Sequence, residues 1–369
     1  MRVLQMAIGF EGGIGKLLVD YCTILKKDVE FEFLIGSYEN GLFESILREH
    51  SFVIHHLPVN YTRKDKIKIV KAIIREKSFD AIHIHGVCDF DVLRLAKKEG
   101  IRNRIVHSHN AVATLHYDSF LYRVLRNLYR NIMYRLFVTE KWACGIEAGK
   151  SMWGEKAVNS GSVRIITNAI ETECYRFNQD MRAIKRSILG IDSDCKVLGT
   201  VGRLTKQKNH AFMIDVFKQF VMSEPNARLV LIGEGELKTE LENKALELGI
   251  SNKVIFLGNR SDVCDLLNIF DLFVLTSFFE GLPVVMIEAQ ANGLPCLVSN
   301  EITKEADLLP NNQYLSLSDS AKAWSNKAIT LINAGRDDCA MKILTERGYD
   351  IKSAAMHLKD IYLSMEVRQ

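Results

Sequence analysis

The sequence predicts an α/β protein built from two doubly wound parallel sheets. Short apolar runs rich in β-branched residues alternate along the chain with amphipathic stretches of helix length, which is the pattern of parallel βαβ units. A length of 369 residues is typical of two such domains. Several apolar runs end in glycine or polar residues, and ligands of doubly wound sheets bind at those strand ends.

The first half of the chain, residues 1–167, is expected to form one sheet. Strands are predicted near 2–9, 31–36, 51–57, 81–86 and 104–109, and helices near 14–26, 42–50, 64–77, 89–98 and 120–137. The last of these helices has a steady apolar stripe with arginines outside it. We favour a core-facing helix, with a basic amphipathic helix on a membrane surface as the alternative.

The second half repeats the alternation after a change of composition around residues 166–175, which we interpret as a linker. Strands are predicted at 197–202, 227–233, 254–258, 271–276 and 295–299, and helices after Asn209, Glu236, Ser261 and Pro283. Residues 168–350 should therefore form a second doubly wound domain.

Charge is distributed unevenly between the halves. Residues 1–167 hold 25 Lys and Arg against 18 Asp and Glu, whereas residues 168–369 hold 23 against 27. A basic first half suits an anionic acceptor or an anionic membrane surface, although an ordinary soluble surface is the simpler alternative. No apolar run approaches a membrane span and no cleavable signal opens the chain, so we expect a cytoplasmic protein, with peripheral contact at the inner membrane face left open.

Metal-ligand patterns are weak throughout the sequence. The eight cysteines are scattered without a CxxC pair, which indicates reduced thiols and no zinc framework. Two DxD tripeptides, at 89–91 and 192–194, lie away from the expected site and are interpreted as helix-capping or turn acids. We expect no metal.

Two strand ends in the first half carry candidate ligand groups. A turn rich in glycine, with Gly12 and Gly13, opens the first helix, and it is as typical of a plain tight turn as of a ligand loop because it matches neither a P-loop nor GxGxxG. His109 ends the strand at 104–109, and His83 and His85 share a face of the preceding strand. A polar site for a hydroxyl-rich ligand explains His109 better than a metal site does.

The stretch from Ser277 to Asn300 contains two acids eight positions apart. Glu280 is expected on a loop leaving a strand, and Glu288 on the second turn of the helix that begins near Pro283 and ends at Gly293. The start of such a helix binds anions, above all phosphate, through free N–H groups such as those of the segment Gly281, Leu282 and Val284.

Two cations should meet Glu280 at the same sheet edge. Arg203 and Lys208 follow the strand at 197–202, and the carboxyl ends of parallel strands share one edge. Two cations with a helix N-terminus make a diphosphate site without a metal, and a carboxylate accepts hydrogen bonds from two sugar hydroxyls.

The segments GRLTKQKNH, GEGEL, VIFLGNRSDV and SFFEGLPVVMIEAQANGLPCLVS resemble retaining glycosyltransferases of family four, which have the GT-B fold, two Rossmann-like domains facing a central cleft. In the first half GGIGK, FEFLIG, AIHIHG, HSHNA and IITNAI are similar to the branch that builds bacterial capsular polysaccharide and exopolysaccharide. Gly145 departs from the Ser common at that position of the family.

The resemblance implies transfer of a sugar from a nucleotide diphosphate, with uridine preferred, to a hydroxyl of a lipid-linked glycan. It implies that Arg203 and Lys208 bind the diphosphate, Glu280 the sugar hydroxyls and Glu288 the ribose, while Gly12, Gly13 and His109 reach the donor from the other domain. Glu280, His109, Arg203 and Lys208 are the catalytic candidates. No cofactor and no nucleic-acid partner are expected, and the last helix, about 351–369, should pack on the first domain.

Other functions stay open at this point. A nucleotide-sugar epimerase would share the two-domain layout without needing an acceptor. A non-catalytic partner subunit of a transferase pair would keep the fold without turnover. A dinucleotide oxidoreductase is disfavoured because the first glycine turn lacks GxGxxG.

Overall fold

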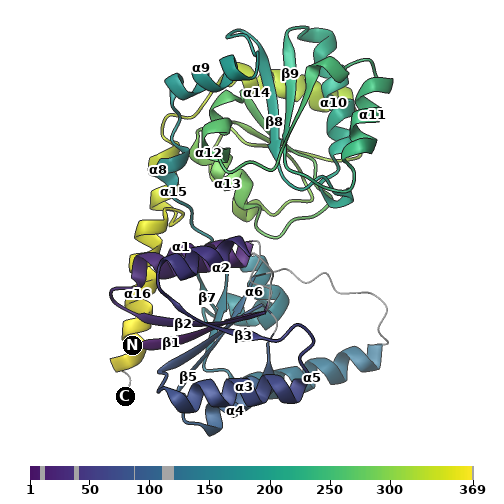
Figure 1. Cartoon of the computed structure of the whole chain (residues 1–369). Coiled ribbons are helices and arrows are strands. Elements are labelled where there is room, and N and C mark those ends of the chain that lie inside the picture. The colour runs from purple at the N-terminus through teal and green to yellow at the C-terminus, as the bar shows by residue number, and fades with distance from the viewer. Residues whose placement is uncertain (9–12, 37–40, 87, 110–119, 368–369) are drawn as a thin grey trace. The chain divides into compact units, whose positions relative to one another are not determined.

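A computed structural model describes residues 1–8, 13–36, 41–86, 88–109 and 120–367 (Figure 1). The chain separates into two compact units. Unit 1 consists of Met1–Ala169 together with Ile351–Gln369, and unit 2 consists of Ile170–Asp350. The residues at 9–12, which include Gly12, lie outside the described part of the chain.

Unit 1 contains a parallel sheet with the strand order β3-β2-β1-β4-β5-β6-β7. Its strands are β1 (Arg2–Ala7), β2 (Glu30–Gly36), β3 (Val53–Leu57), β4 (Ala81–His85), β5 (Asn103–Ser108), β6 (Glu140–Ala143) and β7 (Arg164–Ile165). Its helices are α1 (Gly13–Leu25), α2 (Leu42–Glu49), α3 (Arg63–Glu76), α4 (Phe90–Lys98), α5 (Phe120–Phe137), α6 (Ile146–Trp153), α7 (Glu155–Asn159) and α16 (Ile351–Val367).

Apolar side chains cover both faces of this sheet. One core joins the sheet to α1, α2 and α16, and the other joins it to α3, α4, α5 and α6. Figure 1 shows α16, in yellow, beside the purple helix α1, so the last helix completes a core whose other members come from the start of the chain. Sequence signals fix several helix starts: Thr62 and Asp65 form a capping box for α3, and Asp89 caps α4 as expected for the first DxD tripeptide.

The helix predicted at 120–137 forms, but its burial differs from the prediction. Met133 and Tyr134 are buried, whereas Leu128 and Ile132 are 56% and 48% exposed and Leu136 is also exposed. Helix α5 contacts α4, but the prediction of a core-facing stripe is wrong for Leu128, Ile132 and Leu136. Among the described residues, no helix is long and apolar enough to span a bilayer.

Unit 2 contains a second parallel sheet, with the order β10-β9-β8-β11-β12-β13. Its strands are β8 (Lys196–Val201), β9 (Ala227–Ile232), β10 (Val254–Gly258), β11 (Leu272–Leu275), β12 (Cys296–Ser299) and β13 (Gln313–Leu315). This is the strand order of a doubly wound dinucleotide-binding sheet. Together the two sheets confirm the predicted fold class.

Helices and short 3₁₀ turns surround the second sheet. The helices are α8 (Thr172–Tyr175), α9 (Gln179–Ile188), α10 (His210–Ser223), α11 (Lys238–Glu247), α12 (Val263–Leu266), α13 (Val284–Ala291), α14 (Ala321–Ala334) and α15 (Ala340–Glu346). The 3₁₀ turns are η1 (Lys206–Lys208), η2 (Ser251–Lys253), η3 (Leu267–Ile269) and η4 (Lys304–Ala306). Helix α13 follows Pro283 and is closed by Gly293, whose φ of +76° favours glycine.

Candidate active site

In unit 2 two loops at the carboxyl ends of β8 and β11 are joined by hydrogen bonds. The backbone N–H of Phe278 donates to the carbonyl of Gln207 at 2.9 Å, and the Gln207 side chain donates to the carbonyl of Phe279 at 2.9 Å. The Thr276 hydroxyl donates to the carbonyl of Asn209, also at 2.9 Å. Strands β8 and β11 are neighbours in the sheet, so these bonds fix one loop relative to the other.

Glu280 and Lys208 form an ion pair across these loops. Glu280 Oε1 accepts from Lys208 Nζ at 2.7 Å and from the Ser277 hydroxyl at 2.6 Å. The Glu280 and Lys208 side chains are only 9% and 15% exposed, so water screens the pair little. Each partner orients the other.

Arg203 lies on the same loop as Lys208, and its side chain is exposed. The loop is braced from the neighbouring strand end, because the N–H of Leu204 donates to the carbonyl of Glu234 at 2.9 Å. A Cβ added at Gly235 would lie 2.4 Å from the carbonyl oxygen of Leu204. The glycine in this turn therefore permits close backbone packing, which positions the loop that carries the cations.

The start of α13 lies directly after Glu280. In the part of the chain that the structure describes, the backbone N–H groups of Gly281, Leu282 and Val284 have no hydrogen-bond acceptor, and Pro283 has no N–H to donate. Such N–H groups, together with the helix dipole, attract an anion. The Glu280–Lys208 pair is thus next to a backbone site suited to phosphate.

Glu288 lies on the second turn of α13 and is buried. Its Oε1 accepts from the Tyr175 hydroxyl at 2.7 Å, and burial together with the negative charge of Glu288 raises the pKa of Tyr175. Tyr175 comes from α8, 113 residues earlier in the sequence. No local motif marks it, which is why sequence reasoning missed this contact.

In unit 1 His109 follows β5 and is 8% exposed, while Gly13 begins α1. His109 Nε2 lies 2.9 Å from Nδ1 of His85, so two of the sequence candidates are hydrogen-bonded. Burial lowers the pKa of His109 to about 4. The ring is therefore neutral near pH 7 and can present a hydrogen-bond group to a polar ligand.

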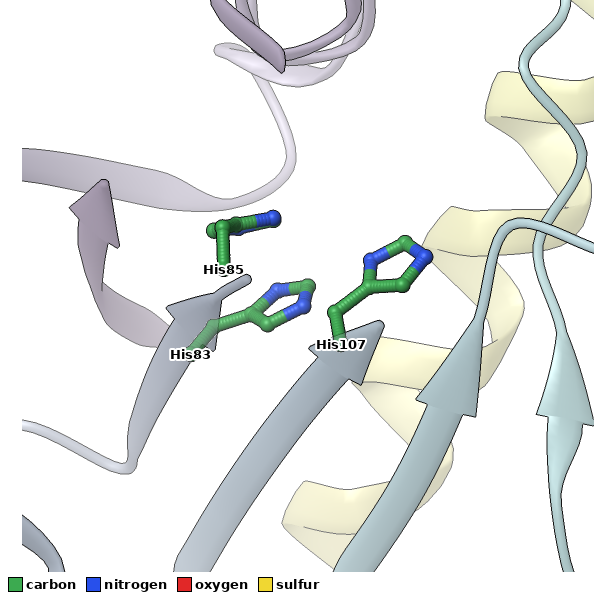
Figure 2. Close-up of side chains that lie close together, drawn as sticks. All are labelled: His83, His85 and His107. Atoms are coloured by element: carbon green, nitrogen blue, oxygen red, sulfur yellow. The ribbon is translucent and has the colours of Figure 1, made fainter. Parts of the chain in front are cut away.

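His83 and His85 of β4 and His107 of β5 lie close together (Figure 2). One nitrogen of each ring lies within 4.8 Å of the others, and burial lowers the pKa of all three well below 6.5. Neutral imidazoles are metal ligands, but no carboxylate of the described residues joins this cluster. Both nitrogens of His85 already have hydrogen-bond partners, so a metal ion would have to displace one of them.

Comparison with known proteins identifies the domain to which the unit 2 site belongs. The family of glycosyl transferases group 1 matches residues 181–346. These residues form a group 1 glycosyltransferase domain. The matched residues include Arg203, Lys208, Glu280 and Glu288, and the match confirms the family resemblance seen in the sequence motifs.

Similarity to proteins named as glycosyltransferases extends over both units. EpsF of Bacillus subtilis, named as a glycosyltransferase, is 28% identical over 98% of this chain and 96% of its own length. An Escherichia coli UDP-Gal:α-D-GlcNAc-diphosphoundecaprenol α-1,3-galactosyltransferase is 26% identical over 83% of this chain and 80% of its own. The crystal structure of Anabaena HepE in complex with UDP has a TM-score of 0.77 at 20% identity, covering 99% of this chain and 100% of that one, which shows that the fold is GT-B.

The structure thus brings some predicted residues together and leaves others apart. Lys208, Glu280 and the start of α13 meet in unit 2, and Arg203 lies nearby on the Lys208 loop without a described ion-pair partner. Glu288 lies deeper, on the Tyr175 side of the same helix. Ser277, which orients Glu280, lies within the segment 277–299 that carries the family resemblance, but no pattern marks it as a site residue.

Proposed function

We propose that the protein is a retaining glycosyltransferase that moves a sugar from a UDP-sugar to a hydroxyl of a lipid-linked glycan in capsule or exopolysaccharide synthesis. The observation that carries this proposal is the Lys208–Glu280 ion pair beside the free N–H groups that open α13. It offers a cation, a carboxylate and an anion-binding helix start on two adjacent loops. A sugar joined to a diphosphate presents the complementary groups, hydroxyls next to negative charge.

Charge stabilisation is assigned to the cations and the backbone N–H groups at this site. As the bond to the sugar breaks, negative charge grows on the leaving phosphate, where Lys208, Arg203 and the N–H groups of Gly281, Leu282 and Val284 stabilise it. These groups make a metal unnecessary for this task. Glu280 accepts hydrogen bonds from the sugar hydroxyls, and Glu288 holds the ribose. Neither acid acts as a nucleophile, and the acceptor attacks from the face that the diphosphate leaves.

His109 is assigned to the donor sugar, and Gly13 to close backbone approach to the donor. A buried imidazole that stays neutral suits a hydroxyl-bearing ligand. Replacing His109 with Ala is expected to weaken transfer without changing binding of UDP, and an unchanged rate would remove His109 from the site.

A cavity in unit 1 is a candidate acceptor site. It has a volume of about 670 Å³ and lies at the carboxyl ends of β1 and β4, with His85, Gly86 and Tyr129 among its lining residues. Arg63 and Lys66, paired with Asp91 and Asp89, form its charged side. Apolar and charged groups together suit a glycan carried on a lipid diphosphate.

The exposed apolar face of α5 supports contact with the inner face of a membrane. Leu128, Ile132 and Leu136 recur every four residues on this face, next to Tyr129 at the cavity. Lys97 of α4 donates to the carbonyl of Leu136 at 3.0 Å, which puts a cation beside the apolar face. A basic, half-apolar helix binds anionic lipid surfaces, where a lipid-linked acceptor is held. In this proposal the protein acts in the cytoplasm as a peripheral membrane enzyme.

The donor and acceptor classes are tested by one screen. UDP-sugars and GDP-sugars are incubated with the protein, with and without a membrane extract, and released nucleotide and glycolipid products are measured. Transfer from one UDP-sugar that depends on the extract is expected. Isomerisation of the donor without extract would favour an epimerase, and UDP binding without turnover in any extract would favour a non-catalytic subunit.

A further inference from the structure

A chain of buried hydrogen bonds in unit 1 leads from α16 to His109. Tyr362 of α16 accepts from Gln5 Nε2 at 3.1 Å, and Gln5 Oε1 lies 2.8 Å from His85 Nε2. His85 Nδ1 lies 2.9 Å from His109 Nε2. All four side chains are buried, so water does not compete for these bonds.

The sheet register explains how residues so distant in sequence form this chain. Gln5 of β1 is paired with His83 of β4, and His85 of β4 is paired with His107 of β5. Alternation along the strands then puts Gln5, His85 and His109 on one face of the sheet. Helix α16 packs against that face, which brings the Tyr362 hydroxyl to Gln5.

We propose that this chain fixes the protonation pattern of His109, so that Nε2 carries the proton and Nδ1 is a bare hydrogen-bond acceptor for the ligand. The inference rests on the proposed role of His109 at the donor. It makes Tyr362, Gln5 and His85 positioning residues that act on the ligand through His109.

The direction of the chain follows from its donors and acceptors. Because the amide N–H of Gln5 donates to Tyr362, the amide oxygen is the atom that faces His85. An amide oxygen only accepts, so His85 Nε2 carries the proton of that ring and His85 Nδ1 is bare. His109 Nε2 must then donate to it, which leaves the lone pair of the ring on Nδ1.

These proton positions require that both imidazole rings are neutral, and burial keeps them neutral. Burial lowers the pKa of His85 well below 6.5 and that of His109 to about 4, so each ring carries a single N–H near pH 7. The links are also coupled: turning the Gln5 amide over would reverse every bond and give His109 an Nδ1–H donor instead.

The direction decides which part of a nucleotide-sugar His109 can serve. A bare nitrogen accepts from a sugar hydroxyl but repels the oxygens of a diphosphate, which have no proton to donate. A protonated Nδ1 would instead donate to a diphosphate oxygen and could not accept from a hydroxyl. The chain therefore assigns His109 to a hydroxyl of the sugar and excludes it from the diphosphate, so its loss should not affect binding of UDP alone. Among the described residues Nδ1 of His109 has no hydrogen-bond partner that would compete with the sugar.

Imidazole nitrogen shifts test the protonation pattern directly. The full chain is labelled with ¹⁵N-histidine, and His109 is assigned by comparison with a His109→Gln variant. We expect a protonated Nε2 and a bare Nδ1 for both His85 and His109 at pH 7.5 without ligand. A protonated Nδ1 on His109, or a shift of the His83 and His107 signals that follows added Zn²⁺ and is reversed by EDTA, would overturn the proposal.

Two substitutions interrupt the series of hydrogen bonds at residues other than His109. Tyr362→Phe removes the hydroxyl that accepts from Gln5 and that also lies 2.7 Å from Nδ1 of His83, and Gln5→Met removes the amide at similar volume. Either change should weaken binding of the sugar donor by about 5- to 10-fold, the value of one hydrogen bond, while binding of UDP changes less than about twofold. Equal weakening of both ligands would overturn the assignment to the sugar.

Tyr21→Phe is the matched control. Tyr21 is a second buried tyrosine of unit 1, and its hydroxyl donates to the carbonyl of Thr167 at 2.8 Å, outside the chain. The Tyr21→Phe substitution should lower stability much as Tyr362→Phe does. It should leave unchanged the ratio of the affinity for the sugar donor to the affinity for UDP. If Gln5→Met does not fold, Tyr362→Phe still decides. If His109→Ala keeps full transfer while the nitrogen pattern is as expected, the chain exists and the proposed role of His109 fails.

Discussion

Replacing Glu280 with Gln removes one negative charge and keeps the shape of the side chain. Oε1 accepts from the Ser277 hydroxyl at 2.6 Å and from Lys208 Nζ at 2.7 Å. A hydrogen bond to a charged group contributes about 1.5–3 kcal/mol, against about 0.5–1.5 for a neutral one, so the variant should lose about 1–2 kcal/mol of stability. For a unit of this size that lowers Tm by about 2–8 °C, and the fold remains.

Catalysis should suffer far more than stability. If Glu280 accepts from sugar hydroxyls, loss of its charge weakens these bonds as well and releases Lys208 from its orientation. We expect kcat/KM to fall by on the order of 10²- to 10³-fold. The assay is release of UDP in the presence of the acceptor extract, with near-UV circular dichroism to check folding.

A matched control makes the same chemical change on the surface of unit 2. Glu173 pairs with Arg176 at 2.9 Å and is exposed, so Glu173→Gln should leave both Tm and kcat/KM nearly unchanged. If Glu280→Gln retains more than a tenth of the wild-type kcat/KM, Glu280 does not bind the donor sugar and the reasoning fails.

Three further changes probe other contacts. Tyr175→Phe leaves Glu288 without its hydroxyl donor, and we expect KM for the donor to rise about 5- to 10-fold with little change in kcat, measured by initial rates. Lowering the pH should destabilise unit 1, because the pKa of His109 in the folded protein, about 4, is below the ordinary value. The contribution of the neutral ring to stability is complete above about pH 6.5 and is lost as the pH falls towards 4. We therefore expect a lower calorimetric Tm at pH 5 than at pH 7. A flat profile would contradict a neutral buried ring. Arg336→Met removes donors to the carbonyls of Asn292 and Phe270, and guanidinium unfolding should show a loss of about 3 kcal/mol or more, whereas a loss below about 1 would mean that these carbonyls find other partners.

The sequence predicts the parts of this structure that depend on local patterns. Alternating apolar runs and helix-length segments are sufficient for both parallel sheets, and Pro283 and Gly293 mark the ends of α13 closely. Parallel topology also explains why Lys208 and Glu280, which follow neighbouring strands, meet at one edge.

Local sequence patterns do not predict the contacts that tertiary packing brings about. Tyr175 reaches Glu288 across 113 residues, and Tyr362 reaches Gln5 across 357, without any motif that links them. The predicted burial of the apolar stripe of α5 is wrong for a related reason. Periodicity shows that a helix has an apolar side, but it does not show whether another element packs on that side. Leu128 and Ile132 are exposed although they belong to the stripe.

Helix α16 also has a consequence for the order in which the protein is made. Residues Ile351–Val367 leave the ribosome after all of unit 2, yet they supply buried core side chains of unit 1, Tyr362 among them. During synthesis the part of the first sheet and of α1 that α16 covers must therefore stay exposed while some 180 residues of the second unit are translated and fold. At about 5–20 residues per second that interval lasts roughly 10–40 seconds. Nascent chains stalled before residue 351 should accordingly bind chaperones through unit 1, and packing of α16 on unit 1 ends this exposure.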